Sequence, residues 1–174
     1  MLIKTLLASV LLFIACAAPA ADPSDPLANA LRDAQKLADC MASFDGKCAV
    51  GHMYIKFFEQ NGMSEADASQ KMADMYAKAK AAGMAPPHYQ LTKPRETIPG
   101  DGRLYTFVPY VVEAQDASKK PIRMRAFFIG ISSDAGATWV FLDGIRANAD
   151  TIRSVMPSYS GQDIPPVGPV PAGQ

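Results

Sequence analysis

Arg103-Leu-Tyr-Thr-Phe-Val-Pro-Tyr-Val-Val-Glu113 is the first of three consecutive runs that decide the fold. The second run is Pro121-Ile-Arg-Met-Arg-Ala-Phe-Phe-Ile-Gly-Ile131, and the third is Ala137-Thr-Trp-Val-Phe-Leu-Asp143. β-Branched and aromatic residues dominate all three runs, and residues typical of turns fill both gaps between them. This pattern predicts three sequential antiparallel strands.

The segment before these strands predicts helices. Asp25-Pro26 is a typical helix start, because Asp caps and Pro suits the first helical position, and Asp45-Gly46 ends this first helix. A second helix is expected to end at Asn61-Gly62, and a third to run from the capping box that begins at Ser64 as far as Gly83. The expected inward face of the first helix carries Leu27, Leu31, Ala34, Ala38 and Met41, and that of the second carries Val50, Met53, Tyr54, Phe57 and Phe58.

The remaining segments complete an α+β pattern. Residues 88–92 predict a short strand before the three long runs, and residues 148–156 predict a short helix after them. Helices that precede an antiparallel sheet predict an α+β fold, with the three helices packed on the sheet. We divide the sequence into a signal peptide (1–20), a linker (21–26), an α+β domain (27–160) and a Pro/Gly-rich tail (161–174).

Two features of the strands bear on the shape of the sheet. Pro109 lies in the middle of the first run and cannot donate a ladder hydrogen bond, which predicts a sheet edge or a bulge that curves the sheet. The runs are also apolar on both faces near their centres. One face must therefore pack on the helices, and the other must be covered or enclose something. A second copy of the chain, in a homodimer, is one expected cover.

The first twenty residues predict export. Lys4 precedes an apolar run, and Ala18-Pro-Ala20 suits cleavage by signal peptidase. Phe13-Ile-Ala-Cys16 also resembles a lipoprotein cleavage box, which would make Cys16 a lipidated first residue. The expected location is therefore the periplasm or the exterior, or, if Cys16 is lipidated, a lipid-anchored position in the cell envelope.

The net charge argues against a nucleic-acid-binding protein, and the number of cysteines argues against a zinc site. Lys and Arg together number 17, as do Asp and Glu, so the net charge is zero and an electrostatic nucleic-acid binder is not expected. Cys40 and Cys48 are the only cysteines after Cys16, and an oxidising compartment favours a structural disulfide between them. The alternative is two buried free thiols. Two thiols are too few for a zinc site, and no cofactor motif is present.

The layout resembles the nuclear-transport-factor-2-like superfamily, a cone of three helices, a curved antiparallel sheet and a terminal helix. The matching residues run from Leu104-Tyr-Thr-Phe-Val-Pro-Tyr110, through Phe128–Asp143, to Ile152-Arg-Ser-Val-Met-Pro157. They are similar to a group of small, uncharacterised exported bacterial members of that superfamily. The resemblance implies a fold and not a reaction. The catalytic acids and tyrosines of the superfamily's enzymes match no motif here, so none is carried over.

Three residue groups are candidates for chemistry. Asp143 with Tyr105 or Tyr89 could act as acid and base if they share a cavity, although Asp143-Gly144 is also a routine strand-ending turn. Arg123 and Arg125 share a strand face and could bind an anion, or Arg123 could pair across the hairpin with Glu113. A copper site is the third candidate, but helical spacing favours a core role for its residues, which are His52, Met53, Met63, Met72, Met75, Met84 and His88.

The stretch Ser132-Ser-Asp-Ala-Gly-Ala-Thr-Trp139 matches the Asp-box of sialidase propellers. A propeller needs several copies, so a hydrogen-bonded hairpin staple is the interpretation here. Two functions remain open. The first is a non-catalytic exported module that binds a small apolar ligand or a protein partner. The second is a small pocket enzyme of isomerase or dehydratase type that uses Asp143 and a tyrosine.

Overall fold

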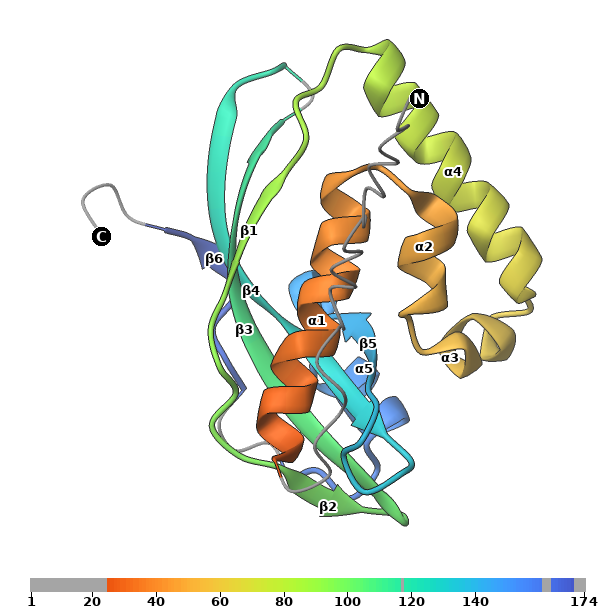
Figure 1. The fold of residues 1–174 in the computed structure, drawn as a ribbon, viewed down its shortest axis with the longest axis vertical. Helices are drawn as coiled ribbons and strands as arrows, with labels where there is room; N and C mark the ends of the chain where they lie inside the picture. The colour runs from red at the N-terminus through yellow and green to blue at the C-terminus, as the bar shows by residue number, and fades with distance from the viewer. Residues whose placement is uncertain (1–24, 117, 161–163, 171–174) are drawn as a thin grey trace, which may run out of the picture.

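The fold is α+β, with helices first and then a curved, unclosed antiparallel sheet (Figure 1). The computed structural model describes residues 25–116, 118–160 and 164–170. The expected signal peptide with Cys16, most of the linker and part of the tail lie outside these residues. The helices are α1 (Pro26–Ala42), α2 (Gly46–Gly51), α3 (Ile55–Gln60), α4 (Glu65–Ala81), the 3-10 turn η1 (Gly144–Arg146) and α5 (Ala149–Val155). The strands are β1 (His88–Leu91), β2 (Ile98–Gly100), β3 (Arg103–Gln115), β4 (Pro121–Ser132), β5 (Val140–Asp143) and β6 (Gly168–Pro169).

The β3–β4 hairpin forms the central pair of strands in the sheet. Its register continues without a break from Leu104 opposite Ser132 to Gln115 opposite Pro121. β1 and β2 pair with the other edge of β3, whereas β5 and β6 pair with the other edge of β4. The three long strands are confirmed. β2 and β6 were not predicted, and β6 lies within the segment expected to be an extended tail.

Pro109 lies in β3, an interior strand, between the residues of β3 that pair with β1 and those that pair with β2. It lies directly opposite Phe127 in the unbroken β3–β4 register. Thr92 donates its backbone N–H to the Pro109 carbonyl over 2.8 Å, so the proline nitrogen faces the same side, between β1 and β2. The missing N–H therefore falls at a gap in strand pairing. The predicted edge strand is not found, because β3 has partners on both sides, and the unbroken register with β4 shows no bulge at Pro109.

Both faces of the sheet are buried by the chain itself. On one face, Val108, Tyr110 and Phe128 pack with residues of α1 and α2. On the other face, Tyr105, Phe127 and Ile129 pack with Ile152 and Val155 of α5. Apolar residues on both sides of the strands thus have covers within the same chain.

The predicted second helix is wrong in its length, because the chain leaves helical geometry after His52. The Phe141 backbone N–H donates to the His52 carbonyl over 2.9 Å, and the Tyr54 N–H donates to the Phe141 carbonyl over 2.8 Å. Met53, which lies between them, forms an isolated parallel bridge with Phe141 of β5. This pairing with a distant strand replaces the helical hydrogen bonds and separates α2 from α3, so four helices precede the sheet.

The outer helix α4 packs on α2 (Figure 1). Gly46 begins α2, and a Cβ atom at this position would lie 2.5 Å from the backbone nitrogen of Ala73 in α4. Only glycine permits so close an approach. The predicted Ser64–Asp67 capping box at the start of α4 is confirmed, with both of its reciprocal hydrogen bonds present.

The predicted inward face of α1 is rotated from the observed one. Ala34 and Ala38 are buried as expected, but Leu27, Leu31 and Met41 are only partly buried. The buried face also includes Asn29 and Asp33, each 4% exposed. These polar side chains are buried because they bind the hairpin that joins β4 to β5.

That hairpin is the predicted staple. The Ser132 hydroxyl donates to Asp134 over 2.7 Å, and Asp134 accepts from both the backbone and the hydroxyl of Thr138. From α1, Asn29 Nδ2 donates to the Gly136 carbonyl over 3.0 Å, and Asp33 Oδ2 accepts from the Trp139 backbone N–H over 3.2 Å. Hydrogen bonds within the hairpin therefore stabilise its turn, and hydrogen bonds to Asn29 and Asp33 fix α1 against the sheet.

Candidate functional site

A cleft of about 420 Å³ lies between the helices and the end of the sheet. Its volume falls in the range of small-molecule pockets. Apart from Leu142, Pro87 and Asp143, its lining consists of methionines and aromatic residues, namely Met41, Met53, Met72, Met75, Phe57, Phe58, Tyr76 and Tyr89. Met75 is 53% exposed, so the expectation that the methionines fill the core is wrong at this position. The four methionines instead line a cleft that a ligand can enter.

The helix break described above helps to build this cleft. Met53 lies at the bridge between the α2–α3 junction and β5, and Phe57 follows in the first turn of α3. Both residues line the cleft, as do Met72 and Tyr76 from α4. Met41 of α1 also contributes, so the cleft is lined by three helices and by the junction between α2 and α3.

Asp143 is the only charged residue among the cleft residues that the structure describes. It ends β5 and caps η1, because its Oδ1 accepts from the Ile145 backbone N–H over 3.0 Å. The same oxygen accepts from the Tyr110 hydroxyl over 2.7 Å. The Tyr110 ring in turn lies 5.5 Å from that of Tyr89, centroid to centroid. Asp143 therefore supplies the one carboxylate of a lining that is otherwise mainly apolar.

The tyrosines around Asp143 remain protonated at neutral pH. Burial, and then the negative charge of Asp143, raise the pKa of Tyr76 to about 12. The same two causes raise the pKa of Tyr89 and Tyr110 well above the usual 10, and for Tyr110 the hydrogen bond to Asp143 adds to them. All three hydroxyls therefore keep their protons, and that of Tyr110 donates to Asp143.

The structure separates the predicted trio of Asp143, Tyr105 and Tyr89. Tyr89 and Asp143 both line the cleft, but Tyr105 is buried on the opposite face of the sheet, where it packs near α5. Pairing Asp143 with Tyr105 is therefore wrong. Tyr110 holds Asp143 instead, and sequence reasoning missed it. Strand alternation places Tyr105 and Tyr110 on opposite faces, and only the register with β4 and β5 shows which of them shares a face with Asp143.

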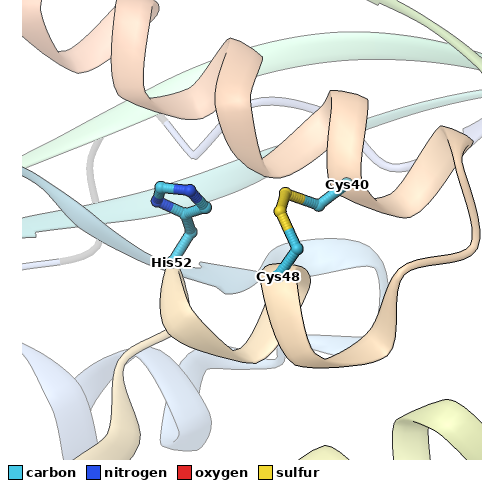
Figure 2. A group of neighbouring side chains, drawn as sticks. All are labelled: Cys40, Cys48 and His52. Carbon is cyan, nitrogen blue, oxygen red and sulfur yellow. A yellow bond between two sulfur atoms is a disulfide. The ribbon is translucent and has the colours of Figure 1, made fainter.

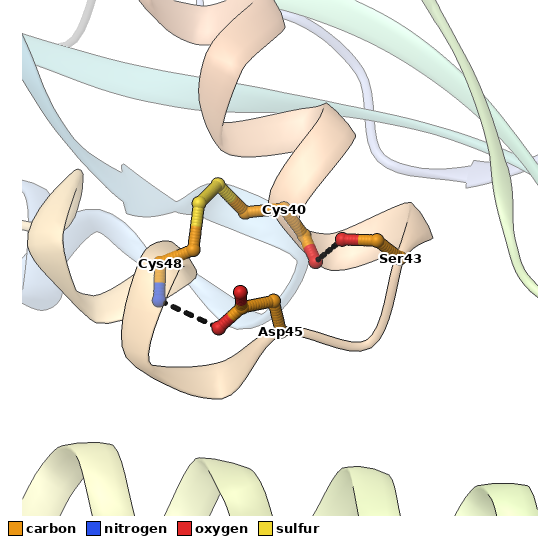
Figure 3. Close-up of a disulfide and its surroundings, with 4 residues drawn as sticks. All are labelled: Cys40, Ser43, Asp45 and Cys48. Carbon is orange, nitrogen blue, oxygen red and sulfur yellow. Dashed lines mark hydrogen bonds between the residues drawn. A yellow bond between two sulfur atoms is a disulfide. The ribbon is translucent and has the colours of Figure 1, made fainter.

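The predicted disulfide between Cys40 and Cys48 is present, with its Cα atoms 5.5 Å apart (Figure 3). Asp45 accepts from the Cys48 backbone N–H over 2.9 Å, and the Ser43 hydroxyl donates to the Cys40 carbonyl over 3.0 Å. The bond joins the last turn of α1 to α2 across a short reversal. A disulfide fits an oxidising compartment. Within the described residues, no helix has the length and apolar character needed to cross a bilayer.

The two candidate anion-binding arginines lie on the expected strand. Arg123 faces Glu113 across the hairpin, and its Nε lies 3.2 Å from the glutamate carboxylate. The cross-strand pair is thus present at a partly exposed site. Arg125 lies opposite Val111 on one side and opposite Gly168 of β6 on the other. Anion binding at Arg123 and Arg125 stays a prediction.

No protein-family model matches this sequence, and no curated protein matches it either.

Proposed function

We propose that this protein is an exported, non-catalytic module that binds a small apolar ligand in the cleft between α3, α4 and β5. The observation that carries the proposal is the combination of a methionine- and aromatic-lined cleft with one carboxylate in its lining. Apolar walls supply affinity by removing ligand surface from water, and a single polar group fixes orientation. The matching ligand is an apolar chain or ring with one hydrogen-bond-donating end, such as an alcohol or an amine.

Displacement of a neutral apolar dye, N-phenyl-1-naphthylamine, tests this proposal. We expect an alkylamine or alkyl alcohol to displace the dye more effectively than the alkanoate of equal length, because Asp143 repels a second carboxylate. Met72→Trp fills the cleft and should abolish dye binding, whereas Met63→Trp, outside the cleft lining, should not. Equal dye binding by both variants would contradict the proposal.

The second candidate function is a pocket enzyme of isomerase or dehydratase type. Tyr89 and Asp143 line the same cleft, which favours the enzyme function. The Tyr110 hydroxyl already binds the Asp143 carboxylate, which counts against it. Native mass spectrometry of protein purified from its own cells distinguishes the two functions. Retention of an unmodified ligand supports the binding function. Conversion of that ligand by the natural protein, but not by the Asp143→Asn variant, supports catalysis.

We also propose membership of the nuclear-transport-factor-2-like superfamily. Helices on one face of a curved antiparallel sheet, with a short helix after β5, support it. A homodimer through the second sheet face has weaker support, because α5 already covers Tyr105, Phe127 and Ile129. Sedimentation showing only monomer at tens of micromolar protein would remove that proposal.

The proposed location is the periplasm, with the disulfide as support. A lipid anchor on Cys16 is the alternative. Cell fractionation and intact mass of the Cys16→Ser variant separate the two. An unchanged mature mass and an unchanged fraction exclude lipidation.

A further inference from the structure

His52 lies beside the disulfide, where α2 ends (Figure 2). One imidazole nitrogen and the sulfur atoms of Cys40 and Cys48 all lie within 4.8 Å of one another. Among the residues that the structure describes, no other group of three His, Cys, Asp or Glu side chains meets that spacing. Cys48 and His52 are four residues apart in and beside α2, so both side chains face the end of α1 that carries Cys40.

We propose that Cys40, Cys48 and His52 bind one Cu(I) ion once the disulfide is reduced. Thiolate sulfur and imidazole nitrogen are the donors that soft copper prefers. Three such donors satisfy a trigonal Cu(I) ion, whereas structural zinc takes four protein ligands. Cys40, Cys48 and His52 are not among the residues that line the cleft, so this proposal does not depend on the proposed ligand.

The spacing of the three donors suits this coordination. A metal ion about 2.3 Å from each sulfur and about 2.0 Å from the nitrogen, in trigonal geometry, holds the donors roughly 4 Å apart. Breaking the sulfur–sulfur bond lets the two sulfurs separate by side-chain rotation, and the backbone already brings the two cysteine Cα atoms to 5.5 Å. His52 then needs little movement, because its nitrogen starts within 4.8 Å of both sulfurs.

The chemistry balances with a dithiol as the reductant. A thiolate of the dithiol attacks the sulfur of Cys48, which is more exposed than Cys40, and Cys40 leaves as a thiolate. The second thiol of the reductant then attacks the mixed disulfide, which releases Cys48 and an oxidised, cyclic reductant. Two electrons and two protons have passed to the protein. Cu(I) then displaces the two thiol protons and keeps its oxidation state.

The surroundings of the site limit its contact with water. His52 is only partly exposed, and one nitrogen of its ring already lies within 4.8 Å of both sulfur atoms. Cys40 is only 5% exposed, so that water has little access to an ion bound there. While the disulfide is present, the two sulfur atoms are bonded to each other and do not bind a metal ion. Reduction makes both of them available.

Competition for Cu(I) against the chromophoric chelator bicinchoninate tests the proposal. The protein carries Cys16→Ser so that only two thiols are present. After reduction with a phosphine and removal of the reductant under anaerobic conditions, we expect one Cu(I) per chain to be withdrawn from the chelator. The oxidised protein should withdraw none. X-ray absorption should show two sulfur scatterers and one nitrogen scatterer.

The two histidines of the chain provide a matched control. His52→Gln leaves the disulfide intact and should weaken Cu(I) binding by more than the roughly 10–100-fold that loss of an outer-shell partner costs. His88→Gln, at an exposed position of β1, should change nothing. Circular dichroism checks that the reduced protein remains folded. The proposal is overturned if uptake is the same in oxidised protein, if His52→Gln binds Cu(I) as tightly as His88→Gln, or if reduction unfolds the chain.

Discussion

Asp33 and Trp139 are joined across 106 residues of chain, because the Trp139 backbone N–H donates to the buried Asp33 carboxylate over 3.2 Å. Arg32 and Lys36 also donate to this carboxylate, each over 2.9 Å. Trp139 is the last residue before β5, so this contact, together with the one from Asn29 to the Gly136 carbonyl, fixes α1 to the hairpin that joins β4 to β5.

Replacing Asp33 with Ala should destabilise the fold by about 2–4 kcal/mol. The change leaves the Trp139 N–H buried without its partner, but the loss is smaller than for a fully buried ion pair, since Lys36 is half exposed. Urea unfolding measures it. Asp39→Ala, at an exposed position of the same helix, is the control and should cost less than about 0.5 kcal/mol. Equal midpoints for the two variants would show that the contact is not stabilising.

Acid should weaken this contact. Burial alone would raise the pKa of Asp33, but the hydrogen bonds from Arg32 and Lys36 outweigh it and hold the pKa below 3.8. The unfolded chain then binds a proton at a higher pH than the folded chain does, so stability is full above about pH 4 and falls as the pH passes through the folded pKa. Urea unfolding between pH 2 and 5 should show a shallower decline for Asp33→Asn than for the natural sequence. Parallel curves would contradict this prediction.

Loss of the disulfide should lower stability moderately without abolishing folding. The bridge closes a separation of only eight residues, for which the chain-entropy model gives about 2–3 kcal/mol. We expect Cys40→Ser and Cys48→Ser to unfold at similarly lowered urea concentrations. Thiol titration of oxidised, denatured protein in a Cys16→Ser background should find no free thiol. Two titratable thiols would show that the bond does not form in solution.

Gly136 combines a left-handed backbone with a close contact. Its φ is +91°, and an added Cβ would lie 2.5 Å from the Cβ of Pro26 at the start of α1. We expect Gly136→Ala to cost more than about 2 kcal/mol, since backbone strain and the clash add. Gly102→Ala is the matched control, because Gly102 has a φ of +71° but nothing within 4 Å of the added atom. The difference between the two melting temperatures isolates the contact with Pro26, and no difference would refute it.

The strands and the capped helix starts could be predicted because they depend on neighbouring residues. Asp25 and Ser64 cap helices through side-chain contacts a few residues long, and β3 and β4 have a strong local pattern. The break after His52 could not be predicted, because it depends on Phe141, almost ninety residues away in the sequence. The burial of Asp33 is similar, since a polar residue is expected at the surface until its distant partner is known.

In the candidate site, too, residue types could be predicted, but contacts between residues distant in the sequence could not. Asp143 and Tyr89 could be selected by residue type, and both line the cleft. The choice between Tyr105 and Tyr110 required the strand register, which alternation alone does not give. His52 could not be linked to the disulfide from sequence, because its place beside Cys40 depends on how α1 and α2 pack.

The bridge between Met53 and Phe141 also affects how one molecule meets another. A strand at the edge of a sheet offers unpaired N–H and C=O groups, to which a strand from a neighbouring molecule can add. At Phe141 both groups are already bound, by His52 and Tyr54, and β6 pairs further along the same side of β4. The chain therefore occupies with its own backbone the position that an invading strand would take, which protects this side of the sheet from fibre-like growth.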